Sequence, residues 1–216
     1  MDSLNQLFDR QISTLIEKGY PALTGMSERT LLGHCERLRR RLRSVSTGAL
    51  DLAAGRIPFV LVVSGHRLEA AAAMGRVRRD GRPGLVSMRP VTPADFAPLS
   101  FLRLPGSPVY LLGGFDRGDN NRNVTPEDAL RRIRKDGRSP LTIEEGVAVL
   151  THYPDVLVPN HCFSLPGSRR EDQRVPALWL SAGRPKLGWC WDRNPHTWLG
   201  SASCVRRGGV RLPKVS

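Results

Sequence analysis

The residues best suited to chemistry lie in the last third of the chain, in two short segments rich in Cys, His and Asp. The segment PNHCFSLPGSR places His161 next to Cys162, and the segment WCWDRNPHTW carries Asp192 and His196. A thiol beside an imidazole that a carboxylate orients is the arrangement of a nucleophilic catalyst. If the two segments meet in the fold, Cys162, His161, His196 and Asp192 are therefore candidate catalytic residues.

The local sequence also supports a purely structural interpretation of these residues. The residues after Cys162, FSLPG, do not begin a helix, so the helix N-terminus that can lower the pKa of a reactive thiol is missing. Strand alternation makes Cys190 a small buried residue, and the run from Asp192 to His196 has the composition of a turn. The sequence thus favours a protein that is not an enzyme. An enzyme or small-molecule binder with a site at these residues is the alternative.

A metal site is a third interpretation of the same region. The ligands would be His161, Cys162, Cys190, His196 and Cys204, but the paired CxxC spacing of zinc sites is absent. Adjacent His161 and Cys162 would also point to opposite faces of a strand. The glycine patterns of nucleotide-binding loops are missing too. We therefore predict no metal and no cofactor.

A surface of tryptophans and arginines is a candidate binding site for anions or nucleic acids. Indole rings stack on bases, and guanidinium groups neutralise phosphates. The candidate residues are Arg37, Arg39, Arg40, Arg41, Arg43, Arg169, Arg170, Trp189, Trp191 and Trp198. This interpretation requires that at least two tryptophan rings face solvent.

The charge balance supports an anionic partner. The chain of 216 residues has 33 Lys and Arg against 20 Asp and Glu, a net charge of +13. Such a charge attracts polyanions at low salt, although Arg in place of Lys is also typical of a GC-rich genome. The leading hypothesis is a basic binding protein whose partner is RNA or a nucleoprotein. A protein-interaction domain is a further alternative.

The pattern of apolar residues predicts an α+β fold that begins with a helical hairpin. Apolar residues at helical spacing predict helices over 4–16 and 27–44, and most of the Arg37–Arg43 cluster falls outside the apolar stripe of the second. A mixed middle segment follows, with strands expected at 58–63, 85–88 and 109–115.

A helix pair and an antiparallel β-meander complete the expected fold. Thr125 and Thr142 are N-caps of helices over 126–135 and 142–153. The loop between them is long for a helix-turn-helix, and the second helix is acidic and apolar, so a packing hairpin is favoured. At the end of that helix, an imidazolium of His152 would interact favourably with the carbonyl dipoles. Three strand-like runs, 175–181, 185–191 and 197–204, predict the meander.

We expect a cytoplasmic protein made of a helical hairpin (1–50), an α+β domain (51–205) and a basic tail (206–216). A sub-boundary is expected in the polar loop at 118–123. The chain has no apolar run long enough to span a membrane and no signal peptide at its N-terminus. Its four Cys are expected to be reduced thiols.

One resemblance covers most of the chain. The block NVTPEDALRRIRKDGRSPLTIEEGVAVLTHYP, followed by NHCFSLPGSR and VPALWLSAGRPKLGWCWDRNPHTWLGSASC, resembles an uncharacterised actinobacterial protein family, a domain of unknown function. The resemblance extends from about Phe59 onward and is strongest from Asn123 to Cys204. It implies that the chain is one family unit, and it implies no activity, cofactor or catalytic residue.

Overall fold

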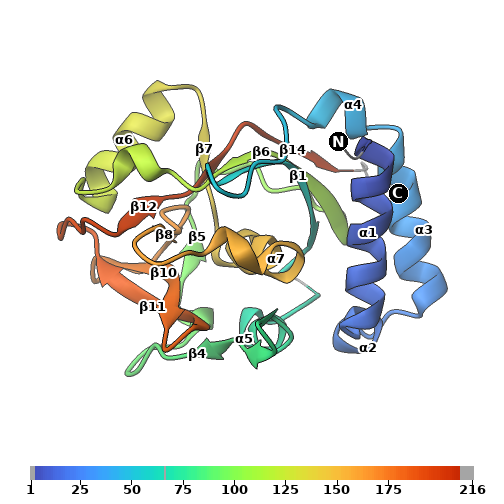
Figure 1. The fold of residues 1–216 in the computed structure, drawn as a ribbon, viewed down its shortest axis with the longest axis horizontal. Coiled ribbons are helices and arrows are strands. Elements are labelled where there is room, and N and C mark those ends of the chain that lie inside the picture. Colours follow the sequence, from blue (N-terminus) through green and yellow to red (C-terminus); the bar gives the residue numbers. More distant parts are fainter. Residues whose placement is uncertain (1–2, 66, 210–216) are drawn as a thin grey trace.

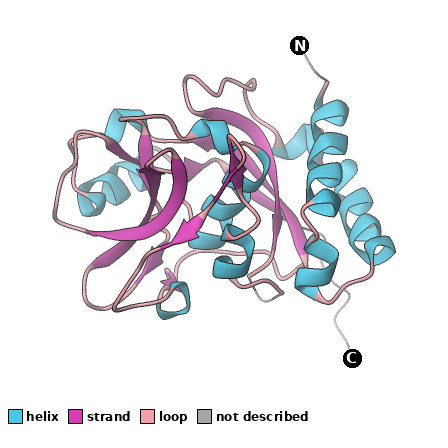
Figure 2. Ribbon diagram, turned by 60° about the horizontal axis from the view of Figure 1, so that its bottom comes forward, coloured by secondary structure: helices cyan, strands magenta, loops and turns pink. Residues whose placement is uncertain are grey.

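Residues 4–45 form a layer of helices, as the apolar spacing predicts. The computed structural model of the protein describes residues 3–65 and 67–209. The helices are α1 (Leu4–Glu17), α2 (Tyr20–Thr24), α3 (Glu28–Arg39) and α4 (Leu42–Val45). The predicted helix over 27–44 divides into α3 and α4, yet its whole apolar stripe from Leu31 to Val45 is buried. Figure 2 shows these helices together at one side of the molecule.

The first sheet has the order β1, β6, β13, β7, with β14 also paired to β6. Its strands are β1 (Arg56–Val63), β6 (Val109–Asp116), β7 (Ser139–Pro140), β13 (Ser203–Cys204) and β14 (Arg206–Gly209). The antiparallel pair of β1 and β6 is almost completely buried, as the apolar runs at 58–63 and 109–115 predict. Helix α4 lies directly on β6, because a Cβ atom at Gly113 would approach the Val45 carbonyl oxygen to 2.0 Å.

Side chains from two helices cover the free edge of β1. The Gln11 amide of α1 donates to the Phe59 carbonyl at 3.1 Å and accepts from the Leu61 N–H at 2.7 Å. The His152 Nε2 atom lies 3.0 Å from the Leu61 carbonyl oxygen. An uncovered strand edge offers unpaired backbone groups to other chains, so these contacts close the sheet on this side.

The second sheet has the order β12, β8, β10, β11, β4. Its strands are β4 (Leu85–Val86), β8 (Cys162–Ser164), β10 (Arg174–Ser181), β11 (Arg184–Trp191) and β12 (Leu199–Ser201). The antiparallel hairpin of β10 and β11 lies where the sequence predicts it. The third expected strand, 197–204, does not continue a simple meander. It splits into β12, which pairs in parallel with β8, and β13, which joins the first sheet.

Short elements complete the described chain. They are α5 (Ala70–Met74), β2 (Arg78–Arg79), β3 (Arg82–Pro83), β5 (Ala97–Pro98) and β9 (Ser168–Arg169), with 3-10 turns η1 (Pro93–Asp95), η2 (Asp119–Asn121) and η3 (Pro154–Val156). In the described part of the chain, no helix is both long and apolar enough to cross a membrane.

Helices α6 (Pro126–Lys135) and α7 (Ile143–His152) begin at the predicted caps, Thr125 and Thr142. They do not pack on each other as a hairpin, because β7 lies between them in the chain and joins the first sheet. Helix α7 contacts α5 and β1 near the centre of the molecule, whereas α6 contacts β7 and β12 (Figure 1). The pair is therefore not a helix-turn-helix unit.

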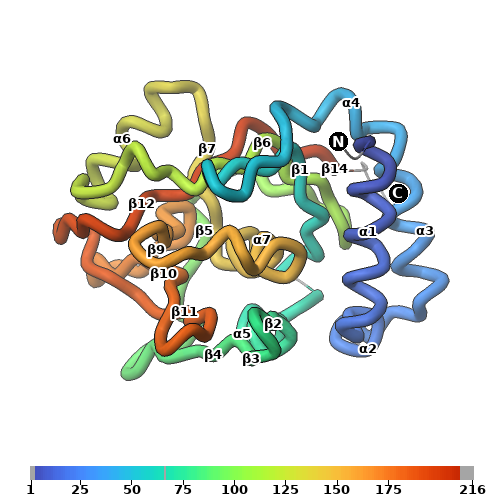
Figure 3. Tube along the Cα trace, viewed as in Figure 1, coloured from blue at the N-terminus to red at the C-terminus, as the bar shows by residue number. Residues whose placement is uncertain are grey.

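One hydrophobic core joins all these layers. Buried residues from Leu7 of α1 to Cys204 of β13 form a single cluster. The expected boundary at residues 50 and 51 thus separates two layers of the same core. The prediction of a basic tail over 206–216 is wrong for its first four residues, because Arg206–Gly209 pair with β6 as strand β14. Figure 3 shows this last segment, in red, running back toward the N-terminal helices. Residues 210–216 lie outside the described part.

A buried ion pair fastens β14 to the rest of the fold. Glu145 of α7 is completely buried, and Arg207 of β14 is nearly so. The Arg207 Nε atom lies 2.5 Å from Glu145 Oε1 and its Nη2 atom 2.8 Å from Oε2. Tyr110 donates to the same carboxylate at 3.0 Å. Burial lowers the pKa of Arg207, but the Glu145 charge more than offsets this effect, so that its pKa lies above the ordinary value.

The substitution Glu145→Gln tests this pair. It leaves the Arg207 charge buried without its counter-ion, which costs roughly 3–5 kcal/mol of the free energy of unfolding. Urea denaturation measures the loss. The matched control is Glu144→Gln, because Glu144 is half-buried and no ion pair of it is found among the described residues; its change should stay within about 0.5 kcal/mol. Equal stability of both variants and the wild type would contradict the role of the pair.

Candidate functional site

The four predicted catalytic residues do not form one group. Among the described residues, no hydrogen bond or ion pair joins any two of Cys162, His161, His196 and Asp192. Cys162 is 3 % exposed, and its Sγ atom lies 3.7 Å from the Val158 carbonyl oxygen. Burial raises the pKa of the Cys162 thiol, which is the opposite of what a nucleophile needs.

The carboxylate that orients His161 is Asp119, which lies in the polar loop at 118–123. The His161 Nδ1 atom lies 2.8 Å from Asp119 Oδ2. Asp119 is held in turn by Arg117, whose side chain is completely buried and whose Nε and Nη2 atoms lie 2.8 and 2.6 Å from the two carboxylate oxygens. Burial raises the pKa of Asp119, but the hydrogen bonds from Arg117 and His161 outweigh it, and its pKa is lowered.

This network also fastens loops to one another. Arg117 donates to the Val156 carbonyl at 2.8 Å and to the Ala53 carbonyl at 3.0 Å. The expected sub-boundary at 118–123 is thus the place where three segments meet. The network fixes the orientation of the half-exposed His161 imidazole. Among the described residues, no nucleophilic side chain bonds to that imidazole.

Asp192 and His196 lie in a turn that holds the start of α6. The Asp192 carbonyl accepts from the Glu127 N–H at 3.0 Å, and the His196 carbonyl accepts from the Asn123 N–H at 2.8 Å. Burial lowers the pKa of His196. Both residues therefore have the structural role that the turn composition favoured.

The tryptophan rings already have partners within the chain. Trp189 and Trp191 lie on one face of β11, as alternation predicts, and Trp191 is 43 % exposed. The Arg174 guanidinium lies 4.5 and 4.9 Å from their ring centroids. Trp198 packs against Trp179 at 6.3 Å and against a histidine ring. These contacts cover ring faces that a base would need, so the expected stacking role of Trp189, Trp191 and Trp198 loses support.

Two of the predicted arginines are also engaged. The Arg170 Nε atom lies 2.9 Å from Asp172 Oδ2. Arg169 is partly buried beside Asp192, and burial lowers the pKa of its guanidinium, which the Asp192 charge partly offsets. Arg170 is therefore compensated by an ion pair, whereas Arg169 is largely withdrawn from the surface.

Four of the five remaining arginines line a groove between α1 and α3–α4, which we call the α3–α4 groove. It has a volume of about 720 Å³. It is lined by Ser3, Leu4, Asn5, Glu36, Arg37, Arg39, Arg40, Leu42 and Arg43. Glu36 and Asp9 lie 2.7 and 2.6 Å from Arg39 and neutralise it. Within the described chain, Arg37, Arg40 and Arg43 have no carboxylate partner, and neither does Arg41 beside them.

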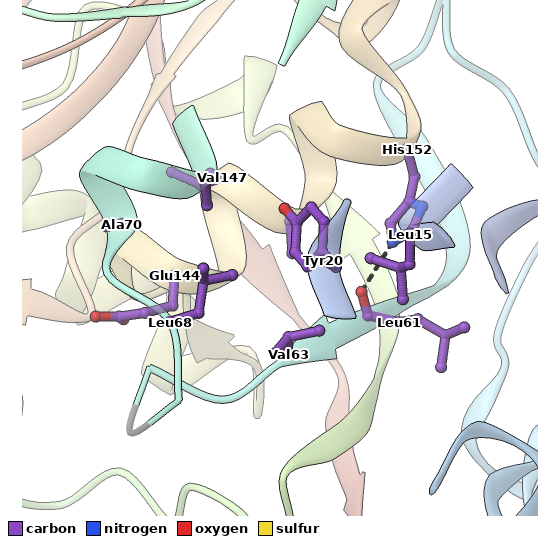
Figure 4. Close-up of a pocket in the computed structure, with 11 residues that line it drawn as sticks. Leu15, Tyr20, Leu61, Val63, Leu68, Ala70, Glu144, Val147 and His152 are labelled. Carbon is purple, nitrogen blue, oxygen red and sulfur yellow. Dashed lines mark hydrogen bonds between the residues drawn. The ribbon is translucent and has the colours of Figure 1, made fainter. Parts of the chain in front are cut away.

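A second hollow lies where α2, α5 and α7 meet β1. A small cavity of about 10 Å³, enough for about one water molecule, is lined by Tyr20, Leu61, Val147 and His152 among others (Figure 4). A groove of about 760 Å³ adjoins it, with Glu144 lining both. Glu69, Arg89 and Glu144 give this groove mixed charge, which favours no single class of ligand.

His152 is a neutral residue of this cavity, and not the imidazolium that its place at a helix end suggested. Burial lowers its pKa to about 4, because desolvation outweighs the hydrogen bond with the Leu61 carbonyl. Its Nε2 atom faces the Leu61 carbonyl, as the dashed line in Figure 4 marks. The Nδ1 atom has no hydrogen-bond partner among the described residues.

The chain can be assigned to a family on its sequence. A model of a family of unknown function, DUF5701, matches residues 14–210. The chain belongs to this family. The match includes both sheets, α3–α4 and the Arg117 network. No curated protein and no solved structure matches the chain. For this DUF5701 protein, we therefore infer the function from the geometry of its own residues.

The titration of His152 makes the stability of the DUF5701 protein depend on pH. The pKa of His152 is about 4 in the folded chain and 6.5 unperturbed. Between these values the unfolded chain binds a proton that the folded chain does not, so stability falls as the pH drops from 6.5 to 4, by about 1.4 kcal/mol per pH unit. Urea denaturation across this range should show a shallower slope for His152→Gln. If stability depends on pH equally steeply in the wild type and in His152→Gln, the pKa of His152 is not lowered in the folded chain.

The thiols of the DUF5701 protein should react slowly. All four Cys are free and buried, and burial raises the pKa of Cys35, Cys190 and Cys204 to about 12. An alkylating reagent at neutral pH should label the folded protein slowly and the denatured protein rapidly at four sites. Rapid labelling of Cys162 in the folded protein would instead support the thiol-enzyme alternative.

Proposed function

We propose that this DUF5701 protein binds RNA or a nucleoprotein through the α3–α4 groove. The observation that carries the proposal is that Arg37, Arg40 and Arg43 line one groove and have no carboxylate partner in the described chain. Arginine binds phosphate oxygens with two parallel hydrogen bonds, so one strand of a nucleic acid could contact all three.

Neighbouring groups increase the positive potential of the groove. The first turn of α1 contributes Ser3 and Asn5 to the lining, and the N-terminal end of a helix carries a partial positive charge. The Arg206 Nη1 atom donates to the Ser44 carbonyl at 2.9 Å, which places a further guanidinium beside α4.

We propose that the α3–α4 groove recognises the charge of the RNA backbone and does not recognise the bases. The Arg174 guanidinium lies over the rings of Trp189 and Trp191, and Trp198 packs against Trp179, which leaves fewer indole faces for bases. Phosphate contacts supply affinity and orientation, but they do not distinguish base sequences. We therefore expect binding to single-stranded RNA with little dependence on its sequence.

The cellular setting is part of the same proposal. The four Cys of the chain are all free thiols, which are typical of a reducing compartment, and this supports the cytoplasm. The excess of Arg over Lys supports an actinobacterial origin. The alternatives, an enzyme near Cys162 and a protein-interaction domain, have no comparable observation behind them.

Fluorescence anisotropy with a labelled RNA, measured over a range of salt concentrations, tests the proposal. Three phosphate contacts to a single strand predict that log K falls with log salt with a slope of about −2. The double variant Arg40→Gln, Arg43→Gln removes two contacts, so the slope should become shallower by about 1.4.

The matched control is the double variant Arg132→Gln, Lys135→Gln, which removes the same charge from exposed positions on α6. The slope of log K against log salt should equal that of the wild type, and this variant should bind RNA only slightly more weakly. If both double variants lose the same affinity, or if the wild type shows no salt-dependent binding, the proposal is wrong and the arginine excess reflects composition.

A further inference from the structure

A second set of arginines meets in a pocket on a different part of the surface. The pocket has a volume of about 470 Å³ and lies between the segment at residues 101–103, the end of α6, β7 and β14. It is lined by Phe101, Leu102, Arg103, Arg134, Gly137, Arg138, Ser139 and Arg207. We call it the four-arginine pocket. Its lining contains four arginines and no acidic residue.

Two of the four guanidinium groups are fixed in place. Arg207 is held by Glu145 and donates to the Ser139 hydroxyl at 2.5 Å. Arg138 donates to the Ser203 hydroxyl and to the Gly114 carbonyl, both at 2.7 Å. These bonds use the Nε and Nη2 atoms of Arg138, so its Nη1 atom remains available for a ligand. Donors fixed in advance lose little entropy when an anion binds.

The other two arginines are exposed and can close over a ligand. Arg103 and Arg134 are both exposed, and within the described chain neither has a carboxylate partner. The Arg134 guanidinium lies 4.4 Å from the ring centroid of Phe101, which is itself 40 % exposed. An exposed aromatic ring at the rim of a cationic pocket offers contact area to the body of an organic ligand.

The charges that remain define the class of ligand. Glu145 compensates Arg207, so three positive charges of the pocket lack a negative partner. The Ser139 hydroxyl accepts a hydrogen bond from Arg207 and can donate its own proton to an anion. Three guanidinium groups and a hydroxyl donor suit a compact dianion with several oxygens, and a phosphate monoester is such a group.

We propose that the four-arginine pocket binds the phosphate of a small organic phosphate monoester, whose body lies against Phe101. This site is separate from the α3–α4 groove and does not rest on the RNA-binding proposal. The four arginines come from sequence positions as distant as 103 and 207, so the fold, and not a local cluster of Arg in the sequence, assembles the pocket.

Isothermal titration calorimetry with ribose 5-phosphate and with inorganic phosphate, both at physiological ionic strength, tests this proposal. We expect one saturable site for ribose 5-phosphate, with weaker binding of inorganic phosphate because it makes no contact with Phe101. Binding of inorganic phosphate alone, or binding of neither probe, would overturn the proposal. The double variant Arg103→Gln, Arg134→Gln should bind ribose 5-phosphate at least about tenfold more weakly.

The matched control is Arg40→Gln, Arg43→Gln, which removes equal charge from the α3–α4 groove and should bind ribose 5-phosphate within about twofold of the wild type. Equal losses in both double variants would show that the probe responds only to net charge, and would overturn the site. Thermal unfolding should be unchanged in the pocket variant, since both of its arginines are exposed.

Discussion

The ion pair of Glu145 and Arg207 is the interaction on which the arrangement of the fold depends. Removing two charges from water is costly, and it is tolerated only where hydrogen bonds satisfy both groups. Here Tyr110, the Thr142 N–H and Ser139 supply those bonds. The pair therefore fixes β14 against β6, the first turn of α7 and strand β7 together. It also explains why residues 206–209 are a strand and not a tail.

The presence or absence of a carboxylate partner separates structural arginines from those available for binding. Arg39, Arg117, Arg170, Arg174 and Arg207 each have a carboxylate partner and serve the fold. Arg37, Arg40 and Arg43 in the α3–α4 groove, and Arg103 and Arg134 at the four-arginine pocket, lack one within the described chain. A net charge of +13 is therefore not spread evenly. Among the compensated residues Arg117 and Arg207 are buried, and five of the uncompensated ones line two hollows.

Local signals in the sequence predicted local structure well. The caps at Thr125 and Thr142, the apolar runs of β1 and β6 and the alternation of Trp189 and Trp191 depend only on near neighbours, and the structure has them as expected. Contacts between distant segments could not be predicted in this way. Examples are the pairing of β12 with β8, the choice of Asp119 as the partner of His161, and the four-arginine pocket. His152 shows the same limit, since its pKa depends on burial that the sequence does not reveal.

We propose that uncompensated arginines give this DUF5701 protein an anionic macromolecular partner. Native purification at low salt is the first experiment to make, with the ultraviolet absorbance spectrum recorded before and after a high-salt wash. We expect that RNA co-purifies, that the wash removes it, and that Arg40→Gln, Arg43→Gln purifies with much less of it. Protein that is free of nucleic acid at low salt, or RNA that remains with the variant in equal amount, would show that the α3–α4 groove does not bind RNA.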